Sequence, residues 1–236
     1  TTGAGSVTFS NAGLLTLNGD IAADGAVTQN GAATVTITAP GSITTTSDAV
    51  NFLRAVTLNG GASGLVSIDT RVGGGAGGDI TFQSTLNAAT AAPNAETLTL
   101  NAGTGGNILF TGVVGAGGRL GAINITNANN VTESAGITAA SLTQAAGQGT
   151  TTFNGAVNTD TATGVSLTGN AQTVNAGITT TGNGSVTFSN AGLLTLNADI
   201  SADGAVTQNG AGMVTINTDR TITTTADAVG FATNVT

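Results

Sequence analysis

Carboxylates make up most of the side chains in this sequence that could do chemistry. Twelve acidic residues stand against four basic ones, all of them arginine, and histidine, lysine and cysteine are absent. A glycosidase needs two carboxyl groups facing each other about 5–10 Å apart across a cleft. Asp20 and Asp24 lie four residues apart, and the pair returns as Asp199 and Asp203. Because a duplicated pair is more typical of a structural turn than of an active site, we predict that the chain is not an enzyme.

Calcium is the metal that such carboxylates would suit, because it prefers oxygen ligands. The stretch GGAGGDITF, Gly74–Phe82, is similar to one calcium-binding nonapeptide, G-G-x-G-x-D-x-U-x. However, Thr81 stands where that motif has a large apolar residue, and tandem copies are missing. Asp-Gly pairs are also ordinary turn residues. We therefore predict no cofactor and no established metal site, with only weak candidates for a cation ligand: Asp20, Asp24, Asp79, Asp199 and Asp203.

Threonine pairs of the form Thr-x-Thr suggest ice binding as a lesser alternative. An ice-binding solenoid face needs such pairs at one fixed place on every coil. The pairs here begin 53, 53, 29 and 44 residues apart, at Thr44, Thr97, Thr150, Thr179 and Thr223. Those intervals share no coil length, and threonine is a favourable strand residue in any case.

A long internal repeat organises the chain that positions these residues. Ser6–Ile37 returns 179 residues later as Ser185–Ile216, with 28 of 32 positions identical. The chain therefore contains a first copy, residues 1–179, and the start of a second copy, residues 180–236. Such a repeat indicates an array of stacked units. Since no long linker interrupts it, we expect residues 1–236 to form a single segment.

Short runs in which one polar residue lies between two apolar residues dominate both copies. Val7-Thr8-Phe9 and Leu15-Thr16-Leu17 are examples, and Asn-Gly, Asp-Gly and Gly-Gly pairs separate such runs. This alternation is typical of half-buried strands joined by turns. No stretch shows helical periodicity. The spacing predicts an all-β fold, a parallel β-solenoid (β-helix) with about 20 residues per coil and about twelve coils.

The sequence also predicts which residues fill the solenoid and which leave it. Loops are expected at Gly73–Gly78 and Ala88–Glu96, and Pro40 is expected at a corner, because proline cannot donate to an interior ladder. A β-sandwich array is the alternative fold, but sandwich domains usually repeat every ~100 residues. The predicted inward-facing residues are Phe9, Phe82, Phe110, Phe153, Phe188, Leu17, Ile37, Leu58, Leu100, Leu167 and Leu196.

Composition and charge argue against several classes of partner. The formal net charge of −8 is unfavourable for binding nucleic acid or an anionic membrane surface. No apolar run approaches the ~18–20 residues of a membrane helix. The chain starts at Thr1 rather than at methionine. We interpret it as a segment of a longer precursor.

Several stretches resemble the degenerate repeats of filamentous-haemagglutinin-like bacterial surface proteins. They are GSVTFSNAGLLTLN, TTTFNGAVNTDTATGVSLTGN and AGITTTGNGSVTFSN, and the resemblance extends over nearly the whole chain. It implies a right-handed parallel β-helix in an extracellular bacterial setting. It implies no catalytic residues, because the family has no catalytic motif in this part of the chain.

The function expected from these observations is structural. We predict the rod of a bacterial adhesin, surface fibre or matrix filament, exposed at the bacterial cell surface. Its expected partners are further repeats of the same chain or other copies stacked end to end, and extracellular glycan or matrix. The alternatives are a glycan- or receptor-binding adhesin module and, less favoured, an ice-binding protein or a polysaccharide-processing β-helix enzyme.

Overall fold

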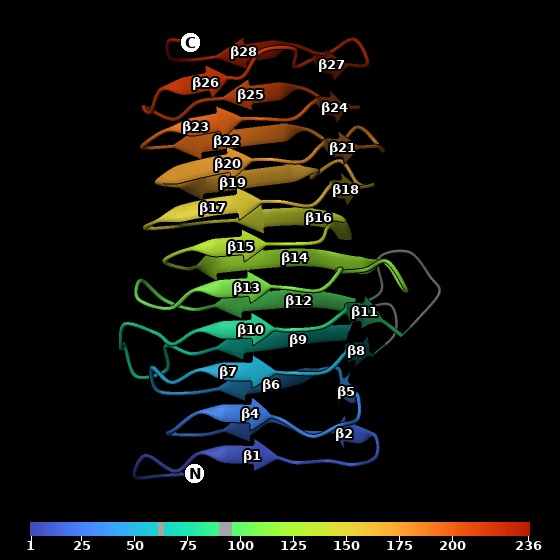
Figure 1. Ribbon diagram of the computed structural model, residues 1–236, viewed down its shortest axis with the longest axis vertical. Helices are drawn as coiled ribbons and strands as arrows, with labels where there is room; N and C mark the ends of the chain where they lie inside the picture. The colour runs from blue at the N-terminus through green and yellow to red at the C-terminus, as the bar shows by residue number, and fades with distance from the viewer. Residues whose placement is uncertain (61–63, 90–95) are drawn as a thin grey trace.

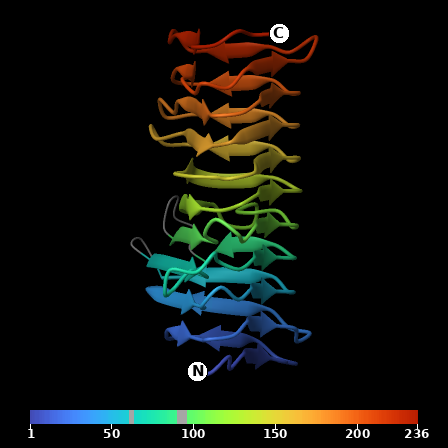
Figure 2. The same ribbon diagram turned by 90° about the vertical axis from the view of Figure 1, so that its left-hand side faces the viewer.

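A computed structural model describes residues 1–60, 64–89 and 96–236. Throughout these residues the regular structure is β-strand, and no helix occurs. Parallel strands are stacked in a rod-shaped β-solenoid (Figure 1). The termini lie at opposite ends of the rod, and the side view shows the same regular stacking (Figure 2). The predicted fold is confirmed.

Each coil contributes to three strand ladders, which we call faces 1, 2 and 3. Face 1 is a sheet of ten parallel strands, so the rod has ten coils, which we number from the N-terminus. The strands of face 1 are, in order, β1 (Val7–Phe9), β4 (Val27–Gln29), β7 (Val50–Phe52), β10 (Ile80–Phe82), β13 (Ile108–Phe110), β15 (Val131–Glu133), β17 (Thr150–Phe153), β20 (Ala171–Val174), β23 (Leu194–Leu196) and β26 (Val214–Ile216).

Face 2 has one weak point, in coil 5. There a single residue, Val114, bridges Leu86 in the coil before and Ile137 in the coil after. The strands of face 2 are β2 (Leu15–Leu17), β5 (Val35–Thr38), β8 (Val56–Asn59), β11 (Leu86–Ala88), the first half of β16 (Ile137–Gln144), β18 (Val157–Thr159), β21 (Ile178–Thr180), β24 (Ile200–Ala202) and β27 (Ile222–Thr224).

Face 3 shares the long strand β16 with face 2. Ile137–Ala139 of β16 pairs with β18, whereas Leu142–Gln144 pairs with β19. The strands of face 3 are β3 (Ile21–Ala22), β6 (Gly41–Thr44), β9 (Gly64–Asp69), β12 (Glu96–Asn101), β14 (Leu120–Asn127), the second half of β16, β19 (Val165–Gly169), β22 (Val186–Asn190), β25 (Val206–Gln208) and β28 (Val229–Phe231).

Coil length varies more than the sequence predicted. Strand partners on face 1 are 20 residues apart from Val7 to Val27 and 30 residues apart from Val50 to Ile80. Insertions at the corners account for the longer coils. Gly73–Gly78 lies between β9 and β10 outside any strand, as expected, and Pro40 lies at the corner between β5 and β6. Residues 90–95 of the second predicted loop lie outside the described residues. The number of coils is therefore ten, not about twelve.

The interior of the rod is filled by the apolar residues of the alternating triplets. In face 1, Phe52, Phe82 and Phe110 occupy one register position in successive coils, and their rings stack with centroids 5.5 and 5.6 Å apart. Of the predicted inward residues, only Phe9 is half-buried, and it still packs against the core. The others are buried, as predicted.

Candidate functional site

The carboxylates at the corners of the rod bind backbone amides of the neighbouring coil. Asp20 Oδ1 accepts a hydrogen bond from the Ser42 amide at 2.8 Å. Its copy, Asp199, accepts one from the Thr221 amide at 2.9 Å. In both cases the donor is one coil further along the rod. These two predicted cation ligands therefore connect successive coils.

Asp24 and Asp203 each contact the chain about one coil before and about one coil after their own position along the rod. Asp24 accepts hydrogen bonds from the Thr46 hydroxyl at 2.6 Å and from the Ala4 amide at 2.5 Å. The Thr46 hydroxyl, and then the Ala4 amide, lower the pKa of the Asp24 carboxyl below its ordinary value of 3.8. Asp203 has a similarly lowered pKa. The cause is first the Asn183 amide and then the Thr225 hydroxyl.

Asp79, the residue of the nonapeptide-like stretch, also forms contacts between coils. Its Oδ1 accepts hydrogen bonds from the amide and from the side chain of Asn107, at 2.8 and 3.0 Å. The five candidate cation ligands are thus not gathered into one site. Across the described part of the chain, no group of three or more histidine, cysteine or acidic side chains could hold a metal ion.

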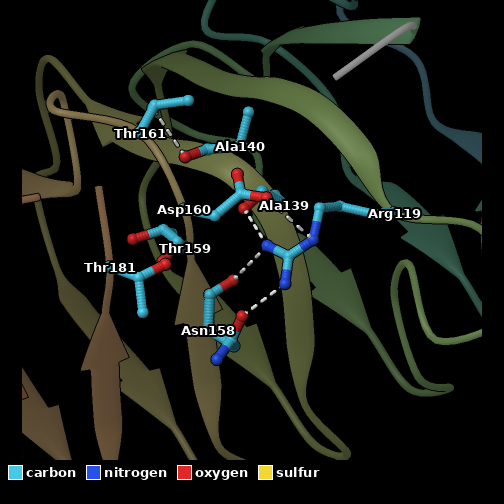
Figure 3. Close-up of polar contacts among 8 residues, drawn as sticks. All are labelled: Arg119, Ala139, Ala140, Asn158, Thr159, Asp160, Thr161 and Thr181. Carbon is cyan, nitrogen blue, oxygen red and sulfur yellow. Dashed lines mark hydrogen bonds and ion pairs between the residues drawn. The ribbon is translucent and has the colours of Figure 1, made fainter. Parts of the chain in front are cut away.

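Arg119 joins three coils at the corner between faces 2 and 3 (Figure 3). It immediately precedes β14 in coil 5, and its Nη1 donates to the Ala139 carbonyl of coil 6 at 2.7 Å. Two further contacts of Arg119 are to residues of coil 7. Its Nη2 donates to Asn158 Oδ1 at 2.5 Å, and its Nε lies 3.3 Å from Asp160 Oδ2. The Arg119 and Asp160 side chains are 24% and 26% exposed. The planar guanidinium suits this use, because it presents several donors in fixed directions.

The same corner contains further links between coils 6 and 7. The Thr161 hydroxyl donates to the Ala140 carbonyl at 2.8 Å (Figure 3). Two buried oxygens here, Thr159 Oγ1 and Asp160 Oδ1, have no hydrogen-bond partner among the described residues. Arg119 therefore acts as a clamp between coils 5, 6 and 7 of the rod.

Buried polar side chains also replace phenylalanine at the inward position that ends a strand, in β4 and β15 of face 1 and in β25 of face 3. Gln29 is fully buried, and its amide donates to Asn11 Oδ1 at 2.8 Å. The copy, Gln208, donates to Asn190 Oδ1 at the same distance. Glu133 is fully buried and accepts from the amides of Ala135, Gly136 and Gly155. None of these residues was singled out in the sequence, although each ends a Val-Thr-x triplet as phenylalanine does elsewhere.

Threonines form a rank along the outside of face 1. In each face 1 strand, the second-to-last residue points outward and is stacked in register on the next. Eight of these ten residues are threonine, in the order Thr8, Thr28, Asn51, Thr81, Leu109, Thr132, Thr152, Thr173, Thr195 and Thr215. The Thr-x-Thr pairs, by contrast, are distributed over all three faces.

A shallow depression of about 370 Å³ interrupts the threonine rank. It is lined by Asp79, Thr81, Asn107, Ile108, Leu109, Asn130 and Thr132. Amides and a carboxylate occupy one edge, where Asn107 Oδ1 accepts from the Asn130 side chain at 2.9 Å. This depression is the part of face 1 in which hydroxyl, amide and carboxylate groups converge.

Comparisons with known proteins give no family for this chain. No family model matches it, and neither curated proteins nor solved structures provide a match. A helix that could span a membrane is not found among residues 1–60, 64–89 and 96–236.

Proposed function

We propose that this chain is a structural segment of an extracellular bacterial fibre, the rod of an adhesin, surface fibre or matrix filament. The observation that carries the proposal is the ten-coil stack itself, in which parallel ladders continue from coil to coil. Strand pairing links each coil to the coils next to it, so a solenoid lengthens by adding repeats without a new core. The resemblance of the repeats to filamentous-haemagglutinin-like surface proteins supports the extracellular bacterial setting.

The polar side chains that would be candidates for chemistry support the same proposal. Asp24 and Asp79 bind groups in neighbouring coils, and Arg119 binds groups one and two coils further along the rod. Such contacts oppose separation of the coils along the rod. In the proposed fibre, further repeats or other copies of the chain continue the stack at its ends, because open strand edges favour pairing with other strands.

Immunogold labelling of the source cells with an antibody against the folded chain tests this proposal. We expect gold particles along thin, unbranched fibres outside the cell. Cells in which the gene has been deleted serve as the control and should lose both fibres and label. Gold confined to the cell interior would contradict the proposal.

The depression on face 1 favours a second candidate function, glycan binding. Its hydroxyl, amide and carboxylate groups can hydrogen-bond to sugar hydroxyls, whereas a smooth threonine rank offers only hydroxyls. A glycan array tests this candidate with Thr81→Arg, which fills the depression, and with Thr173→Arg as a matched control elsewhere on face 1. We expect binding to be lost only in Thr81→Arg. Equal binding by the two variants, or no binding by the parent, would contradict it.

A further inference from the structure

The two copies of the duplicated segment lie on different sides of the rod. β1, which begins the first copy, is on face 1, whereas its counterpart β22 is on face 3. β2 and β23 show the same change, from face 2 to face 1. Every later strand of the segment follows, up to β7 on face 1 and β28 on face 3. The repeat is therefore turned by one face relative to its first copy.

The contacts of the segment move with it. Gln29 binds Asn11 at a corner that follows face 1, and Gln208 binds Asn190 at a corner that follows face 3. The carboxylate contacts of Asp24 likewise recur at Asp203. The sequence of a corner therefore determines its contacts, whichever face of the rod the corner follows. This is possible because a triplet with two inward apolar residues fits any of the three faces.

The turn follows from the number of coils in one repeat. β1 is the first strand of face 1 and β22 is the eighth strand of face 3, so one repeat makes seven whole coils and two further faces. At about 4.8 Å between stacked strands, this step advances roughly 37 Å along the axis. Three such steps make twenty-three whole coils and return to the starting face.

We infer that a fibre of these repeats displays every surface feature on three sides in turn. This inference rests on the proposed continuation of the chain into further repeats. The feature that shows it most clearly is the corner loop Ser10–Leu14, with its copy Ser189–Leu193. Leu14 and Leu193, the last residues before β2 and β23, are 64% and 44% exposed. A partner that recognises such a corner can therefore bind the fibre from any of three sides. This arrangement suits binding to a matrix that surrounds the fibre rather than to one flat surface.

Labelling of the full chain at the two copies of the corner loop tests the display. The chain contains no cysteine, so Leu14→Cys and Leu193→Cys together create two sites for biotin-maleimide without background. Electron microscopy with monovalent streptavidin should then show two labels, roughly 37 Å apart along the rod at about 4.8 Å per coil. We expect them to project from different corners. Two labels on the same side of the rod would overturn the inference.

Single variants and a second pair of positions serve as controls. Leu14→Cys alone and Leu193→Cys alone should each give one label, at its own level and corner. If either substitution disturbs folding, as judged by circular dichroism, Ser10→Cys with Ser189→Cys provides the same geometry. The experiment uses the isolated chain, so its result does not depend on fibres. Failure to find native fibres would overturn the proposed function and leave the angle between the labels unchanged.

Discussion

Arg119 and Asp160 form an ion pair, with Nε and Oδ2 3.3 Å apart, although they belong to coils 5 and 7. The Ala139 carbonyl of coil 6 binds the same guanidinium. The pair therefore exists only when three coils are stacked in the correct register. It lies directly beyond Val114, where face 2 is reduced to a single bridging residue. Polar contacts thus reinforce the rod where its ladder is weakest.

Replacing Arg119 should weaken the rod at this corner. Arg119→Ala removes charged hydrogen bonds to groups that are mostly buried, and such a loss costs about 1–3 kcal/mol in the free energy of unfolding. Arg119→Lys should recover only part of it, because a single ammonium replaces the three guanidinium nitrogens that contact Ala139, Asn158 and Asp160 in fixed directions. Urea unfolding measures the effect. Arg220→Ala, at an exposed arginine, is the matched control, and equal midpoints for Arg119→Ala and the parent would contradict the clamp.

The phenylalanine stack should dominate the stability of coils 3 to 5. Phe82 lies between Phe52 and Phe110, so Phe82→Ala leaves a cavity within the stack. The expected loss is about 3–5 kcal/mol in the free energy of unfolding. Thr81→Ala, at the adjacent outward position, should change it little. Hydrogen exchange should show faster opening of β10 in Phe82→Ala only. Identical exchange in the two variants would place Phe82 outside the core.

The buried carboxyl of Glu133 should be required at its corner. Glu133→Leu leaves the amides of Ala135, Gly136 and Gly155 without their acceptor. The hydrogen bond to the Gly136 amide is buried, and a buried unsatisfied group costs about 1–3 kcal/mol in the free energy of unfolding. Glu133→Gln retains one acceptor oxygen and should be intermediate between the parent and Glu133→Leu. Thermal unfolding followed by circular dichroism gives this ranking. A Glu133→Leu variant as stable as the parent would show that these amides find other partners.

Acid should weaken the corners at Asp24 and Asp203. Both carboxyls have a pKa below the ordinary value of 3.8 in the folded chain. Their contribution to stability is therefore complete above that value and is lost as the pH falls through the lowered folded-state pKa. Replacing both residues with asparagine should flatten the decrease in melting temperature between about pH 5 and pH 2.

Matched hydroxyl variants separate this effect from general acid denaturation. Thr46→Val and Thr225→Val together remove the side-chain donors and leave both carboxyls in place. This double variant should also show a flatter pH profile, because a hydroxyl donor then no longer lowers either pKa. A profile identical to that of the parent would mean that the two hydroxyl donors do not contribute to the acid response, which would then rest on the Ala4 and Asn183 amides.

The class of fold and most of the core could be predicted from the sequence, because the alternation within each triplet indicates which residues face inward. Val7-Thr8-Phe9 and its relatives needed no tertiary information. The number of coils was wrong, since corner insertions such as Gly73–Gly78 lengthen a coil without adding a strand. The clamp at Arg119 was also out of reach, because its acceptors, Asn158 and Asp160, become neighbours only through stacking. The rotation of the second copy by one face also could not be predicted, because it depends on the lengths of all the coils in one repeat.

Diffraction from native fibres tests the central claim, that this chain forms the rod of a fibre in which coils stack along the axis. Strands in the solenoid run across that axis and are spaced by about 4.8 Å along it. X-ray diffraction from oriented fibres of the source cells should therefore show a meridional reflection at about 4.8 Å. Material from cells that lack the gene should not show it. Fibres that contain the chain but place this reflection on the equator, or lack it, would contradict the account.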